Sequence, residues 1–131
     1  MKQAKLVDEF RGVKVGDAGF KISYSFNGGG LHIFEGIVYE ITDLGEKLYS
    51  SDHSIVLRSK APCNSDHKEY MDSFGYPYVE VDGECFPLSF GCCLYSDDNS
   101  NCSFFARDRA ELERIKGLLK TRVVDHYTED F

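Results

Sequence analysis

The chain has 131 residues, 42% of them apolar and 28% charged, and its formal net charge is −7 at pH 7. This length is usual for one globular domain, and this composition excludes a chain that is disordered throughout. The acidic excess argues against general binding to DNA or RNA, which needs an excess of Lys and Arg. No apolar run approaches the roughly 20 residues of a membrane-spanning helix, so we expect no membrane segment.

Alternation of apolar and polar side chains predicts strands in the first half of the chain. The clearest run is 20–26, whose apolar residues share one face and whose polar residues share the other. A glycine-rich loop at 27–30 joins it to a second run, 31–42, in which Gly36 predicts a bulge or bend. Shorter strands are expected at 5–10, 13–15, 47–50 and 54–58, with a turn at 43–46.

The alternation stops between 59 and 77, where Pro62 and Gly75 interrupt a polar stretch. This composition predicts a long surface loop with one helical turn around 68–73. Loops of this length in a compact domain are usually functional or mobile.

Strands are predicted again in the second half by a pair of turn residues, Asp82-Gly83, between runs at 78–81 and 84–90. Asp-Gly in this setting predicts a two-residue type I′ turn, because both turn positions need positive φ. Pro87 has no N–H, so the second run should form an edge strand there or have that N–H position facing solvent. A further pair of strands, 92–95 and 102–106, is expected across the polar loop 96–101.

A helix is predicted over 108–124, with Asp108 as N-cap and Glu111 three residues later. Its apolar residues fall on one face at helical spacing. The tail, 125–131, carries three acidic residues and is expected to fray. We therefore predict one α+β domain over 1–131, a mainly antiparallel sheet of about seven to eight short strands with one C-terminal amphipathic helix.

Positive charge is concentrated between residues 107 and 122, where six basic residues accompany three acidic ones. A helix N-terminus attracts anions, and a guanidinium beside an aromatic ring suits the phosphate and base of a nucleotide. The candidate ligand-binding residues are therefore Arg107, Arg109, Phe104, Phe105 and Asn101. Because adjacent strand residues alternate between faces, we expect only one of the two Phe rings to face a ligand. The alternative is a solvated cationic helix face, since Asp108 would itself occupy the helix N–H groups.

The five cysteines, Cys63, Cys85, Cys92, Cys93 and Cys102, are odd in number. They lack the paired C-x-x-C spacing of a zinc site, and neighbours on a strand point to opposite faces. The start of the chain has no apolar stretch typical of an export signal. We therefore expect buried free thiols, no metal, no disulfide and a cytoplasmic location, in the host cell if the protein is viral.

The only local trio with the residue types of a hydrolase triad is Asp52-His53-Ser54. Neighbours on a strand alternate faces and make a poor triad, and no nucleophile elbow or phosphate-binding loop is present. We therefore expect a protein that is not an enzyme and needs no cofactor.

Two functions remain open, and both are kinds of binding. In the first, the protein captures a small anionic ligand of the nucleotide type, as a sequestering protein in viral counter-defence would. In the second, its acidic surface binds and blocks a basic protein partner. We also predict a homo-oligomer, because one helix covers only one face of a sheet and the strand 20–26 could offer an open edge.

Overall fold

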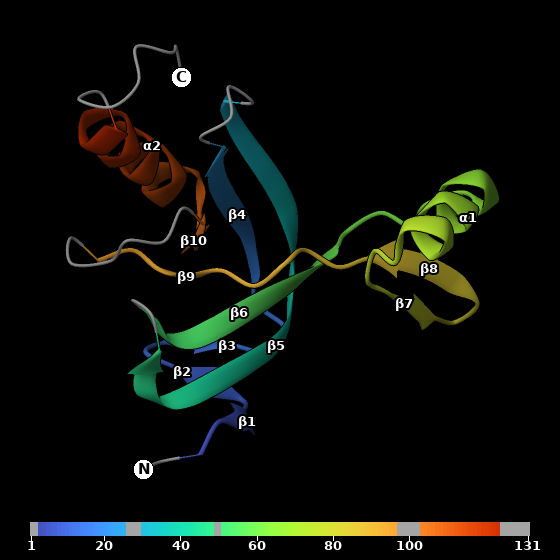
Figure 1. The fold of residues 1–131 in the computed structure, drawn as a ribbon, viewed down its shortest axis with the longest axis horizontal. Helices are drawn as coiled ribbons and strands as arrows, with labels where there is room; N and C mark the ends of the chain where they lie inside the picture. The colour runs from blue at the N-terminus through green and yellow to red at the C-terminus, as the bar shows by residue number, and fades with distance from the viewer. Residues whose placement is uncertain (1–2, 26–29, 49–50, 97–102, 124–131) are drawn as a thin grey trace.

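One long strand, β5 (Gly30–Leu48), organises the sheet in the computed structural model, which describes residues 3–25, 30–48, 51–96 and 103–123 (Figure 1). Its first half pairs with β4 (Ala18–Ser25). Its second half pairs with β1 (Lys5–Val7) on the edge that β4 also uses and with β6 (Ser51–Ser59) on the opposite edge. All three pairings are antiparallel, so one strand holds most of the sheet together.

The remaining described elements are six short strands and two helices. They are β2 (Glu9–Phe10), β3 (Val13–Lys14), α1 (Ser65–Phe74), β7 (Tyr78–Val81), β8 (Glu84–Pro87), β9 (Cys93–Leu94), β10 (Ser103–Ala106) and α2 (Arg109–Val123). β2 pairs with β3, β7 with β8, and β10 with both β4 and β9.

The sheet curls until its two ends are joined by the segment 88–94. On one side of this segment, Ile55 in β6 and Cys92 exchange backbone hydrogen bonds of 2.7 and 2.9 Å. On the other side, β9 lies parallel to β10. The paired strands therefore run in a ring from β4 through β5, β6, the joining segment and β10 back to β4, which gives the sheet an enclosed and an outer face.

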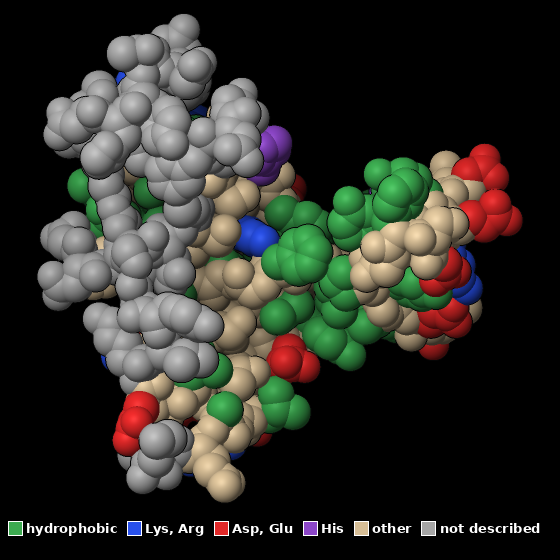
Figure 2. All heavy atoms as spheres, viewed as in Figure 1, with side chains coloured by type: hydrophobic (Ala, Val, Ile, Leu, Met, Phe, Trp, Pro, Cys, Tyr) green, Lys and Arg blue, Asp and Glu red, His purple; other side chains and the backbone are tan. Residues whose placement is uncertain are grey.

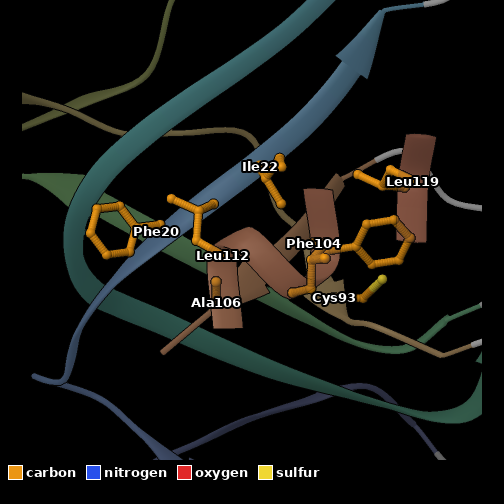
Figure 3. Close-up of a cluster of buried hydrophobic side chains, with 8 residues drawn as sticks. Phe20, Ile22, Cys93, Phe104, Ala106, Leu112 and Leu119 are labelled. Carbon is orange, nitrogen blue, oxygen red and sulfur yellow. The ribbon is translucent and has the colours of Figure 1, made fainter. Parts of the chain in front are cut away.

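Each face of β10 packs on its own apolar cluster. The enclosed face carries Val13, Val38, Ile41, Ile55, Leu57, Cys92 and Phe105. The outer face carries Phe20, Ile22, Cys93, Phe104 and Ala106 and is covered by Leu112, Ile115 and Leu119 of α2 (Figure 3). Gly19 belongs to the enclosed face, where a Cβ would collide with the Phe105 ring. The adjacent pairs Cys92–Cys93 and Phe104–Phe105 are thus split between the two clusters, as alternation on a strand requires.

The broad α+β class with a mainly antiparallel sheet is confirmed, but several details differ from the prediction. The structure has a second helix, α1, where a loop with one turn was expected, and ten strands are described rather than seven or eight. β5 continues through 43–46, where a turn was expected, and takes up an irregularity between Asp43 and Leu48. Gly36 pairs in regular register with Gly19 and Ser59, and the nearby bulge lies between Val38 and Glu40. Glycine is needed at this position because a Cβ would collide with the Arg58 carbonyl oxygen.

Two predicted features of strand pairing are also corrected. The strands at 92–95 and 102–106 do pair, but β9 and β10 run parallel. The strand predicted at 20–26 has no open edge over Phe20–Ser23, because β5 and β10 pair with the two sides of this stretch. The predicted tail, 125–131, lies outside the described residues.

Candidate functional site

The predicted nucleotide site lies where β10 meets α2, and the structure places its aromatic residues inside the protein. Phe104 is buried beneath α2, and Phe105 is buried on the enclosed face of the sheet. The expectation that one of these rings faces outward is therefore wrong, because β10 has a packed layer on both sides. Asn101 lies outside the described residues.

The two arginines of the predicted site do lie together at the start of α2, and both already have partners. The Arg107 guanidinium donates to the Arg11 carbonyl oxygen at 2.8 Å and lies 3.6 Å from the Glu111 carboxylate. The Arg109 guanidinium lies 5.3 Å from the centre of the Phe20 ring. Contacts within the protein thus hold both side chains at the helix start.

One N–H group at the start of α2 is also capped from within the chain. Asp108 accepts a hydrogen bond from the Glu111 N–H at 2.8 Å, which confirms Asp108 as the N-cap. The Glu111 carboxylate in turn accepts from the Arg107 N–H at 3.4 Å. Asp108 thus occupies one of the helix N–H groups that a bound anion would use.

The trio 52–54 contains an Asp–His hydrogen bond, but the contacts of this pair hold the fold together and do not form a catalytic arrangement. His53 Nδ1 lies 2.5 Å from the Asp52 carboxylate, which also pairs with Arg11. His53 Nε2 accepts the Leu94 N–H at 2.8 Å, so we assign a neutral ring with its proton on Nδ1. Burial lowers the pKa of His53, and the hydrogen bond to Asp52 opposes that shift. Both ring nitrogens are therefore engaged, and neither can accept a proton from a nucleophile.

A different surface stands out, and it belongs to the segment 65–87, which we call the arm. The arm consists of α1 and the β7–β8 hairpin and projects from the curled sheet (Figure 1). Asn64 caps α1 by accepting the His67 N–H at 2.8 Å, and Gly75 ends it in the left-handed conformation at φ 72°. Asp82 and Gly83 join the hairpin strands with φ of 51° and 82°, which confirms the predicted type I′ turn.

The arm exposes three aromatic side chains that pack on one another, the aromatic cluster Tyr70, Phe74 and Tyr76. Their exposed fractions are 50%, 66% and 42%, although ring centres of the pairs lie 4.7–6.3 Å apart. Tyr70 and Phe74 are one helical turn apart on α1, so the helix itself sets their spacing. Figure 2 shows apolar side chains gathered where the arm faces the sheet and acidic side chains at its outer end.

Acidic residues dominate the charge of the arm. It carries six carboxylates, all exposed, and one lysine, so its net charge is −5 of the chain's −7. The carboxylates are Asp66, Glu69, Asp72, Glu80, Asp82 and Glu84. Lys68 pairs with Glu80 at 2.5 Å, and the Tyr78 hydroxyl donates to Asp72 at 2.5 Å. The aromatic cluster is thus held on a strongly acidic projection.

Sequence reasoning missed the arm because its helix is almost entirely exposed. Met71 is the only residue of α1 that is buried, so the apolar spacing typical of a packed helix is absent. The useful signals in the sequence were the two helix caps. Asn64 precedes the helix and accepts a hydrogen bond from the His67 N–H, and Gly75 follows its last turn. Six carboxylates within 23 residues were a second signal.

Nothing in the described part of the chain groups three or more metal-ligating side chains, and no described helix is long and apolar enough to cross a membrane. The four described cysteines are free thiols. Burial, together with a hydrogen bond to the Cys63 thiol, raises the pKa of the Cys85 thiol to about 11. Comparison of the chain with protein-family models, with curated protein sequences and with solved structures finds no match.

Proposed function

We propose that the protein is a non-enzymatic binding protein whose arm docks on a basic surface of a partner protein. The observation that supports this is the exposed aromatic cluster on a projection that carries most of the net negative charge. Aromatic side chains are enriched at the centres of protein interfaces, where they provide large contact area with few rotatable bonds. The carboxylates on the same arm would select a cationic partner and speed its association.

The charge of the arm favours a basic protein over the other partners. Two copies meeting through their arms would bring charges of −5 against −5, and nucleic acid would be repelled in the same way. The homo-oligomer predicted from the sequence would therefore have to use another surface. Nucleotide capture at the start of α2 stays a competing hypothesis, with Arg107 and Arg109 as its residues.

A displayed peptide library selected on the immobilised protein tests the proposal. We expect the enriched peptides to carry Lys or Arg around an aromatic or leucine anchor and to bind less tightly as salt increases. Phe74→Ser should abolish this binding without unfolding the protein, because the Phe74 ring is mostly exposed.

Two charge variants test whether peptide binding depends on where the negative charge lies or only on the net charge of the protein. Each variant neutralises three carboxylates. The arm variant carries Glu69→Gln, Asp82→Asn and Glu84→Gln. The control carries Asp8→Asn, Glu46→Gln and Glu113→Gln, three exposed positions outside the arm, and has the same net charge. Only the arm variant should lose the peptides, and equal loss in both variants would refute the proposal. If instead mono-, di- or cyclic nucleotides bind in calorimetry and Arg107→Glu abolishes that binding, the competing hypothesis is correct.

A further inference from the structure

A second feature of the molecule is a lysine inside the mouth of the curled sheet. Lys21 lies on β4, directly opposite Phe105 and Phe34, so its side chain shares the enclosed face with theirs. The residue is only 9% exposed. Its Nζ donates to the Phe90 carbonyl oxygen at 2.6 Å and lies 5.7 Å from the centre of the Phe90 ring.

This ammonium has no carboxylate partner among the described residues. The Phe90 carbonyl oxygen is the only acceptor that the described residues supply, while an ammonium has three N–H donors. The titratable group that interacts with Lys21 is the Cys92 thiol, whose own pKa is raised to about 12 by burial, so that the thiol is neutral. Burial lowers the pKa of Lys21. A buried cation without a counter-ion is uncommon, since buried charges are normally paired.

The ammonium borders a cavity of about 300 Å³. Its apolar lining residues are Phe34, Leu88 and Phe90, together with Ile33, which pairs with Ile22 and so directs its side chain to the other face. Its polar lining residues are Lys21, Ser23, His32 and Ser89. Ser23 and His32 are opposite each other on β4 and β5, so the strand register brings the polar groups to one end of the sheet. In Figure 2 a basic side chain lies beside the apolar area next to the arm.

The outer wall of the cavity is an aromatic ring that the fold leaves uncovered. Phe90 is 63% exposed, although it lies in the segment that joins β6 to β10. A ring beside a cation, at the mouth of a curled sheet, is the combination of apolar wall and convergent polar group that small-molecule sites share.

We propose that this cavity binds a small monocarboxylate with an apolar body, its carboxylate on Lys21 and its apolar part against Phe34 and Phe90. One cation offers charge balance to one carboxylate, and the two N–H donors that Phe90 leaves unused can reach its oxygen atoms. A phosphate carries more charge and usually meets several donors, such as arginine forks. The walls here are mainly apolar and hold no arginine.

The probes for the test are phenylacetate and its neutral analogue, phenylacetamide. In NMR titrations of the full chain, phenylacetate should cause saturable shifts at the amides of Phe34, Ser89 and Phe90, and phenylacetamide should not. Lys21→Met keeps an unbranched side chain without the charge and should weaken phenylacetate binding by about 10-fold to 100-fold. The matched control, Lys14→Met, removes an exposed lysine and should leave the affinity unchanged.

A second variant keeps the proposal falsifiable if Lys21→Met does not fold. Phe90→Ala retains the backbone carbonyl that Lys21 uses and removes an exposed ring, so it should fold and bind phenylacetate more weakly. Equal binding of the carboxylate and the amide, or an unchanged affinity in both variants, would overturn the proposal. Binding of inorganic phosphate in preference to phenylacetate, with the same dependence on Lys21, would overturn the choice of a carboxylate.

Discussion

The sheet and the arm use aromatic residues in opposite ways. In the sheet, two neighbouring rings on β10 are both fully buried, because α2 covers one face and the curl encloses the other. In the arm, side chains of α1 bond to β7, Lys68 to Glu80 and Asp72 to Tyr78. The buried residues of that unit are Met71, Cys85 and Phe86. No layer of the described residues covers the rings of the aromatic cluster, which stay 42–66% exposed. Whether a ring is buried is therefore decided by the number of layers around it rather than by its residue type.

The largest expected effect contrasts one ring from each region. Phe105→Ala should lower the free energy of unfolding by about 3–5 kcal/mol, because it removes a fully buried ring from the enclosed face. Phe74→Ala should change it by less than about 0.5 kcal/mol, because its ring is mostly in water. Urea unfolding measures both values. Similar losses would show that the arm is packed as tightly as the sheet.

A smaller effect is expected at the tip of the arm. Gly83→Val should destabilise the hairpin by at least about 1 kcal/mol, because a β-branched residue resists the φ of 82° at this position. Its neighbour Glu84 is exposed on a strand, so Glu84→Val should be nearly neutral. Thermal unfolding compares the two variants, and a melting temperature that Gly83→Val leaves unchanged would contradict the turn assignment.

The two helix caps test whether the arm unfolds independently. Asn64 and Asp108 each accept a 2.8 Å hydrogen bond from a backbone N–H three residues later. Removing either cap by substitution with Ala should cost about 1 kcal/mol. Hydrogen exchange should show faster exchange within α1 alone for Asn64→Ala, and across the sheet as well for Asp108→Ala, because α2 covers a core. Faster exchange throughout the chain in both variants would mean that arm and sheet unfold together.

The smallest expected effect is a pH dependence that belongs to the sheet. The folded-state pKa of His53 lies below its ordinary value of 6.5, so just below pH 6.5 the unfolded chain binds more protons than the folded one. The His53 contribution to the free energy of unfolding should therefore be complete above about pH 6.5 and decrease as the pH falls below it. His53→Gln should remove this dependence, and His32→Gln, at an exposed position, should retain it. An unchanged profile for His53→Gln, measured by urea unfolding at a series of pH values, would exclude His53 as its source.

Local signals predicted the parts of the fold that are determined locally. The Asp82-Gly83 turn and the Asp108 cap were predictable because each depends on the backbone needs of a few consecutive residues. The parallel pairing of β9 with β10 was not predictable in this way, because the joining segment contacts strands far away in sequence. The same limit explains Lys21, whose alternation with Phe20 and Ile22 indicates a solvent-facing position on a flat sheet. Curling of the sheet turns that face inward.

The candidate sites follow the same division. The sequence placed Arg107 and Arg109 at a helix start correctly, but it could not show that their contacts lie within the chain, since Arg11 is 96 residues away from Arg107. It also could not show that both rings before them are buried, because that requires knowing that the strand has a layer on each side. The acidic residues of the arm can be counted in the sequence. Only the structure shows that they lie together on a segment that projects from the sheet (Figure 1).

The bridge between Arg58 and Leu88 brings together the two points where the chain leaves the sheet and returns to it. The intervening stretch is thus an insertion with adjacent ends, an arrangement in which proteins tolerate replacement of whole segments. Replacing this stretch with a short linker between Arg58 and Leu88 should preserve the ring of strands. It should also remove the arm, which carries the proposed partner-binding surface. Recognition and scaffold could then change independently, so that the same sheet could carry arms of other lengths and charges.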